Sequence, residues 1–130
     1  MRIVTIRTDK PEAEIGIFDD SQQLVYKTWL AHRELAESLH QVLADVLAEQ
    51  QMTLEQIEGL VVYEGPGSFT GLRIGITVAN ALAYSFSVPI IGARGDDWKG
   101  TGIARLVNGD NDTAVLPFYG AEANITTPRK

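Results

Sequence analysis

The interpretation of this chain depends on the stretch Glu64-Gly65-Pro66-Gly67-Ser68-Phe69-Thr70-Gly71-Leu72-Arg73. A short apolar run, Leu60 to Tyr63, precedes it, and a long helix-like run from about Leu72 to Ser87 follows it. A strand, a glycine-rich turn and a helix in this order can present backbone N–H groups to an anion or to a partner. The role of this loop is therefore the first question.

The loop departs from the standard nucleotide-binding motifs. Five residues separate Gly65 from Gly71 and no Lys follows, whereas a Walker A motif needs four residues and then Lys. Its GxGxxxG spacing is also one residue longer than the dinucleotide fingerprint. Two interpretations stay open. One is a tight turn whose helix is capped by Ser68 or Thr70. The other is a non-standard anion site made of Gly65, Gly67, Ser68, Thr70, Gly71 and Arg73.

Alternating apolar residues predict three short strands in the first part of the chain. Because tight turn signals separate them, we expect an antiparallel meander over Arg2–Thr8, Glu12–Phe18 and Gln23–Leu30. A helix with one apolar stripe follows, made of Leu35, Leu39, Val42, Leu43, Val46 and Leu47. Thr53 and Gln56 fit a capping box on a short helix that ends before the strand Leu60–Tyr63.

The helix after the loop is apolar around most of its circumference. Its polar residues are confined to one narrow stripe, Arg73, Thr77, Asn80 and Tyr84. Such a helix must be covered on more than one face, by the sheet and by either the first helix or a second protein. We therefore predict a four-helix contact between two molecules, through the interface residues Leu39, Leu43, Leu72, Ile76, Ala79 and Ala83.

The remaining segments complete an α/β arrangement. We predict a strand over 88–92, a partial helix over Asp97–Val107 and a polar turn over Asn108–Asp112. A final strand over Thr113–Tyr119 and a tail from Ala121 are also expected. Strands that alternate with helices require crossovers and hence parallel pairing.

Composition and charge point to a protein partner. The net charge of −6 is uneven, with −7 in residues 1–64 and +1 in residues 65–130, and no Lys/Arg cluster marks a nucleic-acid surface. The chain has no Cys, which excludes disulfides and thiol catalysis. The longest apolar run, 74–86, is too short and too polar to span a bilayer. We expect a soluble protein.

No catalytic or metal-binding set stands out. His32, expected near the start of the first helix, and His40, expected on its solvent side, are eight residues apart, so no HxxxH pair exists. Three pairs of loop carboxylates, Asp19/Asp20, Asp96/Asp97 and Asp110/Asp112, are only weak metal candidates. The prediction is therefore a non-enzyme with no metal site.

The loop closely resembles the TsaB/YeaZ family, which belongs to the bacterial machinery for threonylcarbamoyladenosine in tRNA. The resemblance is carried by the string from Gly65 to Gly75 (GPGSFTGLRIG) and covers about residues 1–95. Further matches are His32-Arg33-Glu34-Leu35, Ala79, Ala81-Leu82-Ala83-Tyr84 and Pro89-Ile90-Ile91-Gly92. It implies an α/β fold, the first lobe of an actin-like ATPase (RNase H-like) fold, over residues 1–111, with 112–130 as a remnant of a second lobe.

The resemblance also implies a function. Family members are non-catalytic scaffolds that pair with the catalytic TsaD subunit and can pair with themselves. Expected partners are thus a TsaD-like protein, a TsaE-like ATPase through the complex and a second copy. Contact with tRNA would be indirect, any ATP would be bound by the partner, and the location would be cytoplasmic. The alternative function is a nucleotide- or phosphate-binding module that uses the loop Gly65–Gly71.

Two departures from the family pattern bear on these expectations. Arg7-Thr8-Asp9 stands where family members have Asp-Thr-Ser, which weakens the case for nucleotide binding. Only a short segment corresponds to the family's second lobe. A third hypothesis, a metal hydrolase, lacks the HxxxH pair that it would need.

Overall fold

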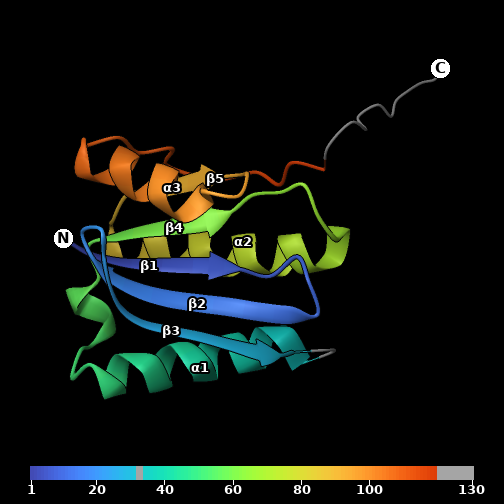
Figure 1. The fold of residues 1–130 in the computed structure, drawn as a ribbon, viewed down its shortest axis with the longest axis horizontal. Helices are drawn as coiled ribbons and strands as arrows, with labels where there is room; N and C mark the ends of the chain where they lie inside the picture. The colour runs from blue at the N-terminus through green and yellow to red at the C-terminus, as the bar shows by residue number, and fades with distance from the viewer. Residues whose placement is uncertain (32–33, 120–130) are drawn as a thin grey trace.

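A five-stranded mixed sheet lies at the centre of the molecule (Figure 1). The structure is a computed structural model that describes residues 1–31 and 34–119. The strands lie in the order β3-β2-β1-β4-β5. Within the described residues, the elements along the chain are β1 (Arg2–Arg7), β2 (Glu12–Asp19), β3 (Gln22–Leu30), α1 (Leu35–Glu49), η2 (Leu54–Gln56), β4 (Gly59–Tyr63), α2 (Phe69–Phe86), β5 (Ile90–Ala93) and α3 (Trp98–Val107).

The pairing confirms the predicted α/β arrangement. Strands β1, β2 and β3 form the antiparallel meander, and β4 and β5 add parallel strands after the crossovers. In register, Thr5 of β1 pairs with Gly16 of β2 on one side and with Val61 of β4 on the other. Both β1 and β4 are therefore internal strands, which fits their nearly continuous apolar character.

Helices cover the two faces of the sheet unequally. Helices α1 and α2 pack on one face, where α2 lies against β4 and β1 and α1 lies against β2 and β3. On the other face, α3 packs against β4 and β5 (Figure 1). A side chain at Gly102 would place its Cβ atom 2.3 Å from Cγ1 of Val61. The glycine thus permits α3 to lie close to β4, and the predicted helix over 97–107 is confirmed despite its glycines.

The predicted strand over Thr113–Tyr119 is wrong. This segment lies along α2 and the end of β5 without strand pairing. The Asn80 side chain takes both backbone groups of Val115, because its Oδ1 accepts from the Val115 N–H and its Nδ2 donates to the Val115 carbonyl, both at 2.9 Å. The Phe118 N–H donates to the carbonyl of Glu64 at 2.7 Å. A side chain of α2 therefore replaces the neighbouring strand. Two further predictions fall outside the described residues: the position of His32 and the tail that begins at Ala121.

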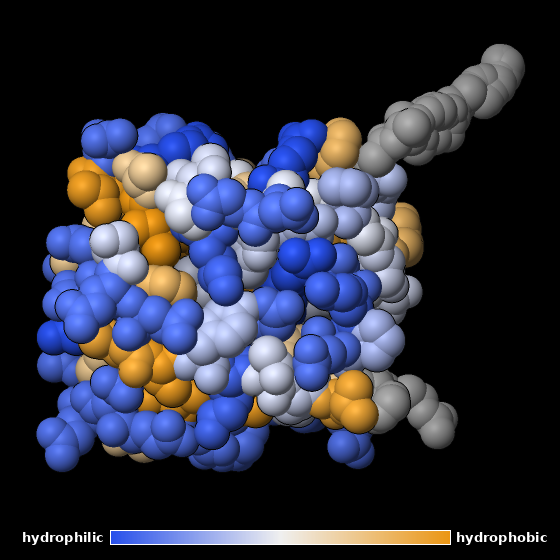
Figure 2. Space-filling view, viewed as in Figure 1, coloured by the Kyte–Doolittle hydropathy of each residue, from blue (hydrophilic) through white to orange (hydrophobic). Residues whose placement is uncertain are grey.

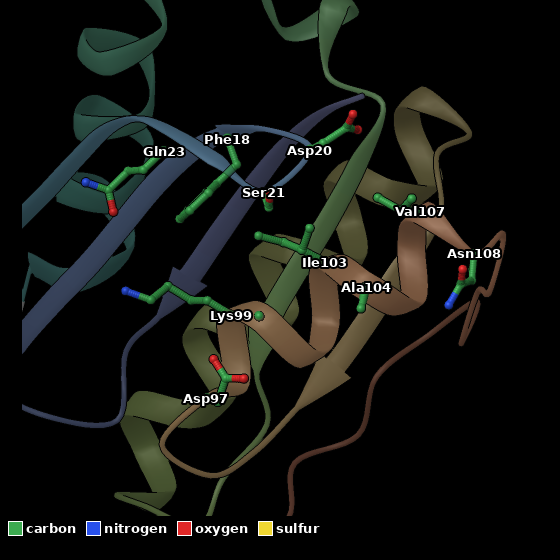
Figure 3. Close-up of a pocket in the computed structure, with 11 residues that line it drawn as sticks. Phe18, Asp20, Ser21, Gln23, Asp97, Lys99, Ile103, Ala104, Val107 and Asn108 are labelled. Carbon is green, nitrogen blue, oxygen red and sulfur yellow. The ribbon is translucent and has the colours of Figure 1, made fainter.

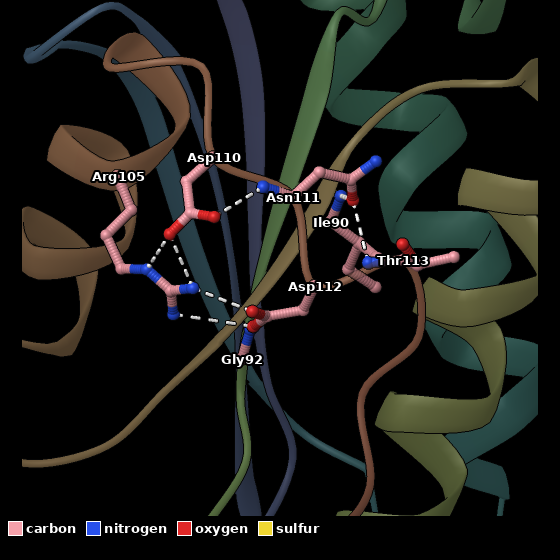
Figure 4. Close-up of polar contacts among 7 residues, drawn as sticks. All are labelled: Ile90, Gly92, Arg105, Asp110, Asn111, Asp112 and Thr113. Carbon is pink, nitrogen blue, oxygen red and sulfur yellow. Dashed lines mark hydrogen bonds and ion pairs between the residues drawn. The ribbon is translucent and has the colours of Figure 1, made fainter.

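The polar turn after α3 fastens the edge strand β5 (Figure 4). Arg105 donates to the carboxylates of Asp110 and Asp112, each at 2.7 Å. The other Asp112 oxygen accepts the N–H of Gly92 at 2.9 Å. The hydrogen bonds that Arg105 donates to Asp112 and then to Asp110 raise the pKa of Arg105, and the hydrogen bonds that Asp110 accepts from Arg105 and from the N–H of Asn111 lower the pKa of Asp110. The turn itself was predicted. The sequence did not predict that its side chains would accept hydrogen bonds from the backbone N–H groups of the edge strand β5.

Candidate functional site

The glycine loop connects β4 to α2 as predicted, but without the predicted side-chain cap. Ser68 is the N-cap residue of α2, yet its hydroxyl makes no capping hydrogen bond, and Thr70 already lies inside the helix. Gly65 has a φ of +129°, and a Cβ atom there would lie 1.9 Å from the carbonyl oxygen of Phe118. Both features require glycine at this position.

The other loop glycines allow the end of β1 to approach α2. The Thr8 hydroxyl donates to the carbonyl oxygen of Gly71 at 2.7 Å. A Cβ atom at Gly71 would lie 2.2 Å from the Thr8 carbonyl oxygen, and one at Gly75 would lie 2.1 Å from the Thr8 hydroxyl. A Cβ atom at Gly67 would lie 2.4 Å from Cβ of Asp9. Close packing therefore accounts for the glycines at 67, 71 and 75 without a ligand.

An internal ion pair occupies the space beside the loop. Arg7 Nε donates to Asp9 Oδ1 at 2.7 Å, and the Asp9 side chain is only 6% exposed. The Arg7 guanidinium lies 3.8 Å from the ring centre of Tyr63, whose hydroxyl donates to the carbonyl of Pro66 at 2.8 Å. Burial lowers the pKa of Arg7, but the hydrogen bond that Arg7 donates to Asp9 and the negative charges of Asp9, Tyr63 and Glu14 together outweigh it, so the net pKa is raised. Burial raises the pKa of Tyr63.

This geometry disfavours an anion site at the loop. Ser68, Thr70 and Gly71 line a cavity of about 320 Å³ together with Lys10 and Asp9, so a buried carboxylate already faces the space that a phosphate would take. Arg73, the cation that the sequence suggested for this site, lines a different cavity on the outer side of α2. Asp9 already accepts two hydrogen bonds from Arg7, so this cation is not free for a second negative charge.

The predicted contact between two molecules through six interface residues is wrong, because all six side chains are buried inside this chain. Leu39, Leu43, Leu72, Ile76, Ala79 and Ala83 are between 0% and 4% exposed and belong to the core of this chain. The apolar stripes of α1 and α2 that the sequence predicts are real, but they face the sheet and each other. These side chains therefore cannot contact a second protein in the folded chain.

The outer side of the two helices carries a different set of residues. Two cavities open at these helices. One, of about 340 Å³, is lined by Ala36 and residues of α2, and the other, of about 250 Å³, by residues of α1, the segment 52–54 and Leu82. We call this surface the helix groove and define it by Ala36, His40, Ala44, Ala48, Ile74, Thr77 and Leu82. Four of these residues recur at every fourth position of α1 and so lie in one row. That spacing is the sequence signal for this surface, and the apolar stripe predicted for this helix does not include it.

Metal clusters and membrane-spanning helices are both absent from the described residues. Within 1–31 and 34–119, no group of three or more His, Cys, Asp or Glu side chains could hold a metal ion. In the same part of the chain, no helix is long and apolar enough to cross a membrane. We take the helix groove, on the outer side of α1 and α2, as the candidate interaction surface.

Known proteins resemble the chain in both sequence and fold. Residues 29–94 match the family model described as "TsaD: tRNA N6-adenosine threonylcarbamoyltransferase". The chain is 32% identical over 114 residues to the tRNA threonylcarbamoyladenosine biosynthesis protein TsaB of Escherichia coli (strain K12), covering 82% of this chain and 48% of that protein. The protein of the same name from Bacillus subtilis (strain 168) is 33% identical over 91 residues, covering 69% and 39%.

A solved structure shows the same fold. YeaZ from Pseudomonas aeruginosa aligns with a TM-score of 0.66 and 22% identity over 72% of this chain and 43% of that chain. This likeness confirms the predicted fold class, an α/β fold of the actin-like (RNase H-like) type. The chain spans about half the length of the E. coli relative. It spans less than half of the B. subtilis relative and of the Pseudomonas aeruginosa structure.

Proposed function

Because the chain belongs to the TsaB/YeaZ family, we propose that it is a non-catalytic scaffold that pairs with a TsaD-like subunit in tRNA N6-threonylcarbamoyladenosine modification. The relatives that support this proposal are named for biosynthesis of that modified nucleoside. We further propose that the chain has no catalytic role and binds no cofactor. Any ATP would be bound by the TsaD-like subunit.

The helix groove is the observation that carries the proposal. Three of the four residues in the row on α1 are alanines, Ala36, Ala44 and Ala48, and their short side chains let a helix of another protein approach closely. Ile74 and Leu82 supply apolar surface along α2, and Thr77 is exposed between them. Two helices that present an apolar groove can form a four-helix contact with two helices of a partner.

The other expected partners follow from the same groove. A second copy would use the same surface, so a homodimer and the complex with a TsaD-like subunit would compete. A TsaE-like ATPase would join through that complex, in the cytoplasm. The net charge of −6 favours contact with tRNA through the partner rather than through this chain.

Co-purification with a TsaD-like subunit tests the proposal. Ala44→Arg places a long cation in the helix groove, and we expect it to weaken the complex at least tenfold, as measured by titration calorimetry. The matched control is Thr101→Arg, because Thr101 is an exposed residue of α3, on the opposite face of the sheet, and lines no cavity named here. The control should bind within twofold of the unchanged protein. Failure of the unchanged protein to bind, or equal loss in both variants, would overturn the proposal.

A further inference from the structure

Helix α3 ends in an exposed asparagine that is followed by glycine. Asn108 is the C-cap residue of the helix, and both Asn108 and Gly109 are exposed. Gly109 has a φ of +88°, and a Cβ atom there would meet nothing within 4 Å. Figure 2 shows hydrophilic residues at the upper left of the molecule, where α3 ends. Water therefore reaches the peptide bond between Asn108 and Gly109.

The order Asn-Gly brings an electrophile and a nucleophile together within one short segment. The backbone nitrogen of Gly109, once it has lost its proton to hydroxide, can attack Cγ of the Asn108 side chain. The bond from Cγ to Nδ2 then breaks and ammonia leaves, which closes a five-membered succinimide ring. Water opens this ring to aspartate or isoaspartate. Glycine favours the ring closure because it has no side chain to obstruct it.

The side chain of Asn108 is not engaged in the way that the other asparagines are. The Asn80 side chain is held by both backbone groups of Val115. The Asn111 amide oxygen accepts the N–H groups of Ile90 and Thr113. Among the described residues, Asn108 has no such side-chain hydrogen bond. Figure 3 shows its amide at the end of α3, just beyond Val107.

The folded turn holds the reaction back. Gly109 donates its N–H to the carbonyl of Leu106 at 2.9 Å, and the ψ of Asn108 is 0°. The ring can close only after this hydrogen bond breaks and the peptide group rotates toward the Asn108 side chain. The ion pairs of Arg105 with Asp110 and Asp112 keep the turn closed (Figure 4). The reaction therefore proceeds from the locally opened turn.

We propose that Asn108 is a site of slow intramolecular deamidation, which takes place each time the turn after α3 opens long enough. The product carries a new carboxylate at the C-terminal end of α3, where the helix dipole disfavours negative charge. Isoaspartate also adds one carbon to the backbone between α3 and Asp110, which displaces Asp110 and Asp112 from Arg105. The modification thus loosens the turn that fastens β5. The site is independent of the partner proposed above, because α3 and the helix groove are on opposite faces of the sheet.

Peptide mapping by mass spectrometry tests the proposal, after the folded chain has been kept for weeks in mildly alkaline buffer. We expect a gain of one dalton at Asn108. Asn80 and Asn111, in the same digest, are the internal controls and should stay unmodified. The synthetic peptide RLVNGDN is the reference, and it should convert about tenfold faster or more, because no folded turn holds its glycine N–H. An Asn108 that is unmodified when this peptide has converted fully would overturn the proposal.

The variant Arg105→Gln tests whether the turn controls the rate. Without its ion pairs the turn opens more often, so we expect deamidation at Asn108 to be about fivefold faster. Arg73→Gln is the matched control, because Arg73 is exposed on α2 and forms no ion pair with the described residues. It should react at the rate of the unchanged chain. Equal rates in all three proteins, each folded by circular dichroism, would overturn control by the turn.

The urea midpoint tests the consequence for the fold. The chain in which Asn108 has converted should unfold at a lower urea concentration than the fresh chain. Asn108→Gln is the control, because glutamine would have to form a six-membered ring and so reacts far more slowly. Its midpoint should not change over the same period. An unchanged midpoint after full conversion of Asn108 would show that the modification does not loosen the turn.

Discussion

The Thr8 hydroxyl donates a hydrogen bond of 2.7 Å to the carbonyl oxygen of Gly71, which ties the end of β1 to the first turn of α2. The two residues are 63 positions apart in the sequence. Their contact is possible because neither Gly71 nor Gly75 has a side chain to separate helix and strand. The glycine-rich string thus serves the packing of α2 against the sheet.

Gly75→Ala should destabilise the fold by about 1–3 kcal/mol, because the new methyl group would overlap the Thr8 side chain in a packed interior. Denaturant unfolding followed by circular dichroism measures this. Gly100→Ala is the matched control, since its methyl group would meet only the side chain of Asp97. The control variant should be as stable as the unchanged chain or more stable by up to about 1 kcal/mol, because Ala has the higher helix propensity. Equal stability of the Gly75 variant and the unchanged chain would contradict this role.

Ala79→Glu should unfold the chain rather than split a dimer. Ala79 is 0% exposed, and an unpaired carboxylate in its place has no hydrogen-bond partner and no room. The expected loss of stability is on the order of 4 kcal/mol. Ala81→Glu, two residues along the same helix at an exposed position, should melt as the unchanged chain does. A folded Ala79 variant, as judged by thermal melting and light scattering, would contradict the burial.

Acid should weaken the link between α3 and the turn that follows it. The pKa of Asp110 is lowered in the folded state, so its carboxylate stabilises the fold above the ordinary carboxyl pKa of about 3.9. That contribution is lost as the pH falls through the lower folded-state value. Asp110→Asn should therefore reduce the urea midpoint at neutral pH, and the difference from the unchanged chain should shrink below about pH 4.

Asp96→Asn is the control for this pH dependence. Asp96 is exposed and forms no ion pair with the described residues, so its replacement should leave the urea midpoint unchanged at each pH. A difference between Asp110→Asn and the unchanged chain that persists undiminished in acid would show that its cause is not the charge of Asp110.

Titration calorimetry with ATP, ADP and phosphate should give no heat of binding at millimolar ligand. The reason is the Asp9 carboxylate, which faces the loop at Gly67 and whose only cationic partner, among the described residues, is Arg7. Arg73→Ala should have no effect on such a titration, because Arg73 lines another cavity. Saturable heat that Arg73→Ala abolishes would restore the anion-binding interpretation of the loop.

Local patterns in the sequence predicted most of the fold. Alternation predicted the meander of β1 to β3, and the spacing of apolar residues predicted α1 and α2. The loop string pointed to the family before any geometry was known. These signals are local, because each depends on residues within one or two turns of a helix or one strand.

Long-range contacts were beyond those patterns. A helix that is apolar around most of its circumference does not indicate which side meets its own sheet, so Leu72 and Ala79 were assigned to an interface although they are internal. Thr113–Tyr119 has strand-like residues, but the Asn80 side chain takes the backbone groups of Val115. Neither outcome can be inferred from neighbours in the sequence.

The loop shows this division most clearly. The amino-acid order alone defined a strand, a glycine-rich turn and a helix, and with them the family, because that string and its spacing are specific. Only the tertiary structure revealed that Gly67 faces Asp9 and that Gly71 and Gly75 face Thr8. It also revealed that Ala36, Ala44 and Ala48 line the helix groove. Burial depends on contacts between segments far apart in the chain, so it arises only when the helices pack on the sheet.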